Sequence, residues 1–176
     1  MHLLSLMVAA CLALGDSPAP RPEVAECLAR VKAIHGGAGP WAVVGYRIGE
    51  RARTELNLPR QSFAIKVVHS TPGEVQYACM ADGLQAATGA SVGKLNLRLE
   101  EVPVDKLRTT IVGLDRTLVF RVRPELARTI LDLPIDRLEA EGRRVAELPD
   151  EALFTMEEIK APAPASPESG RKGDGR

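Results

Sequence analysis

The sequence is poor in aromatic residues and cysteine, and it carries no net charge. Aromatic residues make up 3% of the 176 residues, so a hydrophobic core must be built from Leu, Val, Ile and Ala. The three cysteines are too few for a disulfide framework, and they lack the CxxC spacing of a zinc or thioredoxin site. Basic and acidic residues both number 23, so nothing draws the chain towards nucleic acid or an anionic membrane. The composition indicates a small globular protein that does not bind nucleic acid.

The N-terminal residues 1–22 form a short apolar run followed by a proline-rich break. The run is too short to span a bilayer, and it predicts an export signal. Two processing routes stay open: Ala13 and Gly15 provide the small residues that a signal peptidase needs, whereas residues 8–11 resemble a bacterial lipobox ending at Cys11. We therefore expect a periplasmic protein or one tethered to the membrane by a lipid on Cys11. A marginally buried or disordered N-terminal helix is the alternative.

The length and the C-terminal composition define the domain organisation. Residues 161–176 contain little that could be buried, which predicts a disordered tail. Residues 23–160 remain, and their length is typical of a single domain.

Two amphipathic helices are predicted on either side of a glycine-rich loop. Residues 23–34 carry apolar side chains at helical spacing, and Gly36 and Gly37 end that helix because glycine readily adopts positive φ. The next helix begins at Pro40, a favoured first-turn residue, and presents Arg47 to water. Its buried face contains Trp41, Val44, Ile48, Ala52 and Leu56, while Gly45 and Gly49 allow another backbone to approach closely.

A third helix, at residues 74–88, is rich in small residues and is therefore expected to pack tightly in the middle of the fold. Cys79, Asp82 and either Gln85 or Ala86 lie on one stripe of it, at spacings of about three. This places a thiol and a carboxylate one turn apart.

β-branched and apolar residues predict strands at 62–69, 94–100, 109–114 and 117–122, and residues 153–159 predict a closing strand or helical turn. We expect the first four strands to form an antiparallel sheet. Amphipathic patterns predict further helices at 124–131 and 134–148. The fold class is therefore α+β, with a mixed or antiparallel sheet of about four to five strands packed against helices.

Each candidate site residue has a structural and a functional interpretation. His35 is either a helix-end residue or a catalytic or ligand residue, and Cys79 is either an inert core thiol or part of a pocket. A nucleophilic Cys79 is disfavoured because the nearby Asp82 raises the pKa of a thiol. Asp82 either caps or pairs locally or lines a pocket, and its candidate partners are Lys94 and Arg47.

Other apparent motifs carry less weight. Residues 89–94, GASVGK, are one residue shorter than a phosphate-binding loop and follow a helix instead of a strand, which excludes a nucleotide triphosphatase. The helix start at Gly39 offers free N–H groups that would favour an anion. His69 is interpreted as a surface or strand-end residue.

Several of these residues, in this order, resemble the signature of the FmdE family of formylmethanofuran dehydrogenase proteins, HGHxCPG…GYR, C-x-x-D-A-I-Q…GC…GKGNL. The matching residues are His35-Gly36, Pro40, Gly45-Tyr46-Arg47, Cys79, Asp82, Gln85, Gly89, Gly93-Lys94 and Asn96-Leu97. The resemblance implies an α+β domain, frequently dimeric, with a polar site that is metal-associated in some members. It implies catalytic roles for His35, Cys79 and Asp82, and cofactor-binding roles for Gly36, Gly37, Gly39, Tyr46, Lys94 and Asn96.

The chain departs from this pattern at the metal-ligand positions. Gly37 replaces the second His, Gly39 replaces the loop Cys, and Ala90 stands where the pattern has GC. A transition-metal site usually needs three or four nitrogen or sulfur ligands, and only His35 and Cys79 remain. We therefore expect no metal or other cofactor, with a zinc or iron ion disfavoured.

Two functions follow as hypotheses. The first is an exported small-molecule binding or accessory module with a degenerate metal site, which could form a homodimer. The second is an enzyme that acts on a C1-type or small organic substrate through His35 and the Cys79–Asp82 pair.

Overall fold

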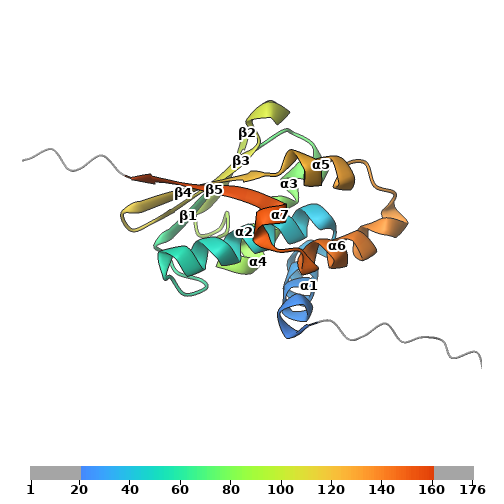
Figure 1. The fold of residues 1–176 in the computed structure, drawn as a ribbon. Coiled ribbons are helices and arrows are strands. Elements are labelled where there is room, and N and C mark those ends of the chain that lie inside the picture. Colours follow the sequence, from blue (N-terminus) through green and yellow to red (C-terminus); the bar gives the residue numbers. More distant parts are fainter. Residues whose placement is uncertain (1–20, 161–176) are drawn as a thin grey trace, which may run out of the picture.

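The computed structural model describes residues 21–160, which form one α+β domain with a five-stranded mixed sheet (Figure 1). Residues 1–20 of the predicted export signal, with Cys11, and the predicted tail lie outside the described residues. The helices are α1 (Pro22–His35), α2 (Pro40–Leu56), α3 (Val75–Ala78), α4 (Met80–Thr88), α5 (Pro124–Ile130), α6 (Leu138–Glu147) and α7 (Asp150–Leu153), with short 3₁₀ turns η1 (Val104–Lys106) and η2 (Ile135–Arg137). The strands are β1 (Ile65–Thr71), β2 (Leu97–Glu101), β3 (Arg108–Gly113), β4 (Arg116–Val122) and β5 (Phe154–Lys160).

The sheet has the strand order β2-β1-β3-β4-β5. Strands β1, β3 and β4 pair antiparallel, as the sequence predicts, and β5 pairs antiparallel with β4. The expectation that the strand predicted at residues 94–100 joins antiparallel is wrong, because β2 pairs parallel with β1, with Val67 opposite Leu97. The crossover through α3 and α4 returns the chain to the same end of the sheet, which makes the pairing parallel.

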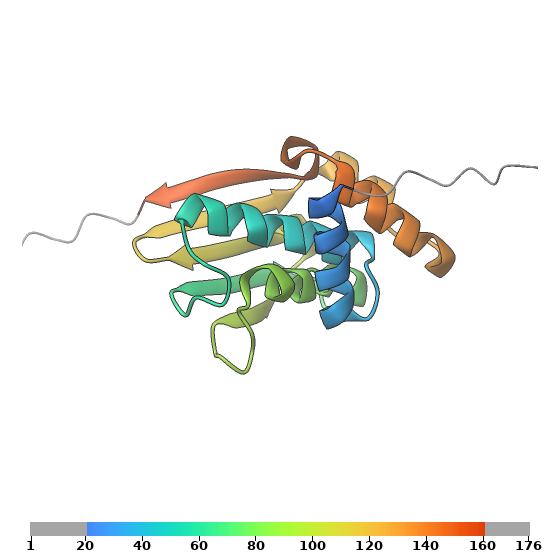
Figure 2. The same cartoon turned by 90° about the horizontal axis from the view of Figure 1, so that it is seen from below.

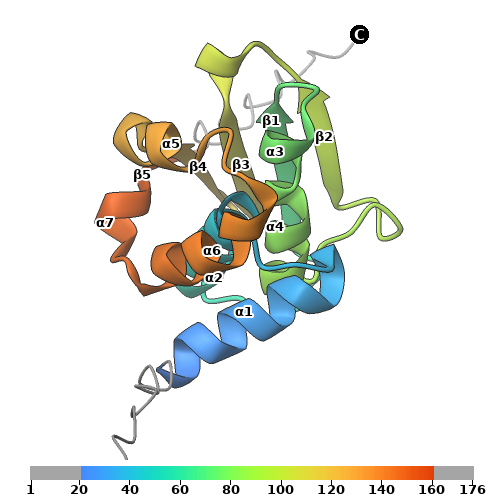
Figure 3. The ribbon, with the colours of Figure 1, turned by 90° about the vertical axis from the view of Figure 1, so that its right-hand side faces the viewer.

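Helices α1, α2 and α4 lie together on one face of the sheet (Figure 2), and α6 packs beside α1 and α2 (Figure 3). The predicted inner face of α2 is buried, with Val44, Ile48 and Ala52 fully so. The predicted helix at residues 74–88 is interrupted at Cys79, which separates α3 from α4. No helix within residues 21–160 is long and apolar enough to cross a membrane.

Glycines bring α2 and α4 into backbone contact. A Cβ atom on Gly45 would lie 2.1 Å from the carbonyl oxygen of Met80, and one on Gly83 would lie 1.8 Å from that of Ala42. Only glycine leaves room for this approach. The prediction of close packing at Gly45 is confirmed, and the contact fixes the first turn of α4 beside the start of α2.

Candidate functional site

The centre of the candidate site is a pair between His35 and Asp82. His35 is the last residue of α1, where Gly36 ends the helix with φ +89°, and Asp82 lies in the first turn of α4. The ring nitrogen Nδ1 of His35 is 2.7 Å from Oδ2 of Asp82. The structure thus brings together two of the three residues predicted to be catalytic, and the predicted partners of Asp82, Lys94 and Arg47, are wrong.

The pair fixes the hydrogen on the imidazole ring. An ionised carboxylate only accepts hydrogen bonds, so Nδ1 of His35 carries the hydrogen and donates it to Asp82. In the neutral ring, Nε2 then presents a lone pair, and it has no hydrogen-bond partner within the described residues. Side-chain exposures of 28% for His35 and 45% for Asp82 leave the pair open to a ligand.

Cys79 lies at the junction of α3 and α4, and its thiol is held in the protonated form. The Sγ–H group donates to the carbonyl oxygen of Gln76 at 3.1 Å. Burial, followed by the negative charge of Asp82, raises the pKa of the thiol to about 12. The predicted effect of Asp82 on Cys79 is confirmed, and a thiol in this state is not an effective nucleophile at neutral pH. Cys27 and Cys79 are both free thiols.

Lys94 and Asn96 belong to the loop between α4 and β2. The Nζ atom of Lys94 donates to the carbonyl oxygen of Gly89 at 2.9 Å, and it lies 5.3 Å from the centre of the Phe63 ring. Asn96 is buried and donates from Nδ2 to the carbonyl oxygen of Ile65 at 3.0 Å, so it anchors the loop to β1. Both residues have contacts that support the loop, and neither is paired with His35 or Asp82.

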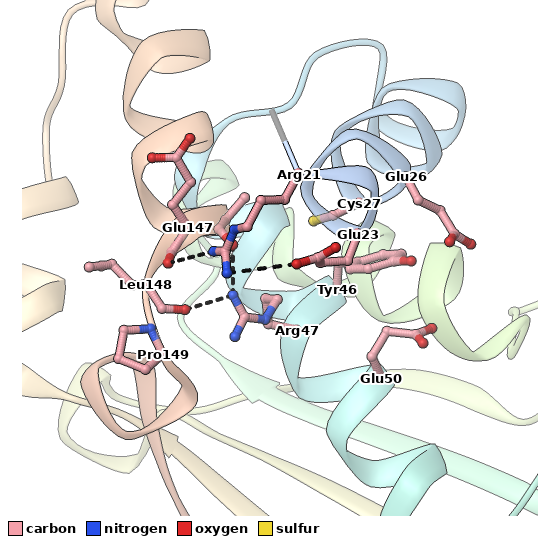
Figure 4. Close-up of a pocket in the computed structure, with 11 residues that line it drawn as sticks. Arg21, Glu23, Glu26, Cys27, Tyr46, Arg47, Glu50, Glu147, Leu148 and Pro149 are labelled. Atoms are coloured by element: carbon pink, nitrogen blue, oxygen red, sulfur yellow. Dashed lines mark hydrogen bonds and ion pairs between the residues drawn. The ribbon is translucent and has the colours of Figure 1, made fainter. Parts of the chain in front are cut away.

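Tyr46 lines a separate cavity of about 410 Å³ between α1, α2 and the end of α6 (Figure 4). Burial, with the nearby charge of Glu50, raises the pKa of the Tyr46 hydroxyl to about 12, and burial also raises the pKa of the Cys27 thiol to about 12. Both groups are therefore neutral near pH 7. They offer the cavity hydrogen-bonding atoms, and neither of them titrates in the neutral range.

Arg47 borders the same cavity and is engaged in intramolecular bonds. Its Nη1 donates to the carbonyl oxygens of Ala146 and Leu148, both at 2.8 Å, and its Nη2 contacts Asp150 at 2.6 Å. The prediction that Arg47 faces water is wrong, because the chain after α6 folds over it. This arginine holds the α6–α7 connection against α2.

The glycine loop between α1 and α2 leaves space where the family pattern has side chains. Within residues 21–160, and apart from the adjacent residues of the chain, no heavy atom lies within 4 Å of a Cβ built on Gly36, Gly37 or Gly39, although the positive φ of Gly36 favours glycine. Gly37 and Gly39 themselves supply only backbone groups. They therefore provide no side-chain metal ligands.

The donor atoms of this site do not fit a zinc or iron ion. His35 offers one ligand atom, Nε2, because Nδ1 contacts Asp82, and the thiol of Cys79 is protonated and donates to the carbonyl oxygen of Gln76. The described residues contain no group of three or more His, Cys, Asp or Glu side chains that could hold a metal. A structural or catalytic transition-metal site needs at least three such ligands.

The interpretation of His69 as a surface residue is wrong. Its side chain is fully buried, with Nδ1 3.0 Å from Oγ1 of Thr109 and Nε2 3.2 Å from the carbonyl oxygen of Tyr77. Burial lowers the pKa of His69 to about 4, so the ring is neutral. The sequence contains a pattern that predicts this burial, because His69 continues the alternation by which Ile65 and Val67 point towards the core.

The chain is similar to known proteins in its family pattern and in its fold. Residues 34–155 match the family model described as "FmdE, Molybdenum formylmethanofuran dehydrogenase operon". The solved structure of a tungsten formylmethanofuran dehydrogenase FmdE-like protein from Syntrophus aciditrophicus is similar, with a TM-score of 0.51 and 17% sequence identity over 80% of this chain and 73% of that chain. No curated protein matches the sequence. At this identity the structural similarity concerns the fold alone.

Proposed function

Since the chain belongs to the FmdE family, we propose that it is an exported small-molecule binding or accessory module whose ligand contacts the His35–Asp82 pair. The observation that carries this proposal is the 2.7 Å contact between Nδ1 and Oδ2. It holds the imidazole in one orientation and leaves Nε2 available beside an open glycine loop.

The chemistry of the ring indicates the class of ligand. In the neutral tautomer, Nε2 of His35 accepts a hydrogen bond, so it favours a ligand with a hydroxyl or amino group. Gly37 and Gly39 permit a small molecule to approach the loop backbone without meeting a side chain of the loop. The proposed ligand is a small hydroxylated or amino compound, bound without a transition metal.

A second function is favoured by the same geometry. A histidine that is oriented by a carboxylate through Nδ1 and has a free Nε2 has the arrangement of a general base. Such an enzyme would remove a proton from a C1-type or small organic substrate at His35, with Asp82 stabilising the imidazolium. Cys79 would then help to shape the site without attacking the substrate, since its pKa is about 12.

Ligand binding can be tested by following the ring nitrogens of His35 with ¹⁵N NMR while alcohols, amines and carboxylates of one to four carbons are added. We expect a saturable shift of the Nε2 signal with a hydroxyl or amino compound. Asp82→Asn should weaken the effect about tenfold or more, because the amide no longer fixes the tautomer. Glu139→Gln is the matched control, since it removes an exposed acid that pairs with Lys32 of α1, the helix that also carries His35. A screen that leaves the His35 signals unchanged would contradict binding at this pair.

The metal-free part of the proposal has its own measurement. Elemental analysis of the purified protein should find well below one equivalent of zinc or iron, and chelation should leave the fold intact. One full equivalent of either metal would overturn it. Turnover that disappears in His35→Ala, with the fold retained, would favour the enzyme over the binding module.

Export is tested by mass spectrometry of the mature N-terminus. A cleaved chain, or one beginning at an acylated Cys11, would support it. A mature protein that still begins with unmodified Met1 would refute it.

A further inference from the structure

A cavity of about 500 Å³ lies between α5, η1 and the aromatic pair Trp41 and Tyr77. Neither His35 nor Asp82 lines it. Its walls include the apolar side chains of Val104, Leu107 and Leu131. This volume and this mostly apolar lining are typical of sites for small organic ligands.

The floor of the cavity is aromatic and fixed. The rings of Trp41 and Tyr77 meet edge to face, with their centres 4.9 Å apart and their planes at 69°. Nε1 of Trp41 donates to the carbonyl oxygen of Ile130 at 3.1 Å, which ties the indole to the end of α5. In a chain with one tryptophan and two tyrosines, this concentration of rings provides a large apolar surface at one point.

The rim of the cavity is predominantly cationic. Arg121, Arg123 and Arg128 border it, and among the described lining residues Asp105 is the acid that opposes them. Arg121 contacts Glu157 at 3.4 Å and Arg128 contacts Glu125 at 3.7 Å, and these four side chains are all more than half exposed. Exposed pairs of this kind are weak, so both arginines can turn towards a bound anion.

Arg123 is better placed than the other two arginines. Its Nε donates to the carbonyl oxygen of Glu151 at 2.9 Å, which anchors the side chain. Its two terminal nitrogens form no hydrogen bond within the described residues, and they provide the planar fork that binds a carboxylate through two parallel bonds.

We propose that this cavity binds a small organic anion with an apolar body, in which the body lies against Trp41 and Tyr77 and the carboxylate meets Arg123. Apolar walls under a rim with excess positive charge match such an amphiphilic anion in both shape and charge. The site is separate from the proposed function, so its failure would leave the His35–Asp82 proposal unaffected.

The single tryptophan gives a direct probe, because its fluorescence reports on the floor of this cavity. Octanoate, which does not absorb at the wavelengths used, is titrated into the full mature protein, and 1-octanol serves as the neutral analogue of the same length. We expect a saturable change in Trp41 emission with octanoate and at least tenfold weaker binding of 1-octanol. Arg123→Ala should weaken octanoate binding about tenfold or more, while Arg98→Ala, an exposed arginine on β2, should leave it unchanged.

A steric variant keeps the test valid if Arg123→Ala folds poorly. Ala127 lines the cavity from α5, and Ala127→Phe should abolish the octanoate response while circular dichroism shows a retained fold. His35→Ala should bind octanoate as the parent does. Equal binding of octanol and octanoate would overturn the proposal, as would binding that survives both cavity variants. Trp41 emission that changes with protein concentration alone would also overturn it, because a second copy of the chain would then cover the cavity.

Discussion

Replacing Gly83 by alanine is expected to separate α2 from α4 and to disturb the His35–Asp82 pair. The added Cβ would lie 1.8 Å from the carbonyl oxygen of Ala42 and 2.6 Å from the backbone nitrogen of Tyr46, whereas real Cβ atoms essentially never come within 3.0 Å of such neighbours. Both obstructing atoms belong to the backbone of α2. No change of side-chain rotamer can relieve the overlap, so one helix must move relative to the other.

The expected cost follows from this geometry. Overpacking of a core usually costs about 1–3 kcal/mol, and an overlap with two backbone atoms belongs at or above the upper end of that range. The better helix propensity of alanine recovers about 1 kcal/mol. We therefore expect a net loss of at least about 2 kcal/mol, which for a domain of this size corresponds to a fall in Tm of at least about 6 °C.

Urea denaturation followed by circular dichroism measures this loss, and ¹⁵N NMR of His35 measures the displacement of Asp82, the residue before Gly83. Gly37→Ala is the matched control on the site loop. Its Cβ meets no heavy atom within 4 Å among residues 21–160, and its φ is not in the left-handed region, so its stability should stay within about 1 kcal/mol of the parent. A Gly83→Ala protein as stable as this control would refute the backbone contact between α2 and α4.

Three further predictions concern titration, reactivity and packing. Because the pKa of His69 is about 4 in the folded state against 6.5 for the free side chain, the unfolded chain takes up this proton first. The free energy of unfolding should thus be undiminished above pH 6.5 and fall by about 3 kcal/mol as the pH drops to 4, and His69→Gln should lose this part of the pH dependence in urea titrations. Because burial raises the pKa values of Cys27 and Cys79 to about 12, both thiols should react with iodoacetamide at pH 8 at least about a thousandfold more slowly than a free thiol. Rapid alkylation of the native protein would contradict their burial. Arg47→Ala should lower the free energy of unfolding by about 2–4 kcal/mol in thermal unfolding, because Asp150 and two carbonyl groups lose their hydrogen-bond donor. Arg47→Lys should not restore this loss, since an ammonium group cannot reproduce the geometry of the guanidinium fork. Full rescue by lysine would refute this account.

Local patterns predict most of the elements because they depend on neighbours in the chain. Gly36 ends α1, Pro40 begins α2 and Pro124 begins α5, each through the backbone preferences of that residue alone. The buried face of α2 follows from helical periodicity in the same way. The boundaries are less accurate where side chains compete with the backbone, as in the loop that Asn96 anchors before β2.

Contacts between distant residues are not encoded by such patterns. The sequence marks Asp82 as a carboxylate in need of a partner, but it cannot select His35, 47 residues away, over Lys94 or Arg47. The register of β2 against β1 and the burial of His69 likewise depend on how the helices cross the sheet. The apolar cavity at Trp41 escapes sequence analysis altogether, because α2, α3, η1 and α5 each contribute only a part of it.

The sequence by itself therefore determined the fold class and the family, since both depend on residue types in order along the chain. Only the tertiary structure decided that His35 and Asp82 form a pair and that an arginine-rimmed cavity opens elsewhere. The position of Asp82 depends on the contact of α2 with α4 through Gly45 and Gly83, which requires space in three dimensions and does not follow from the spacing of residues in the chain.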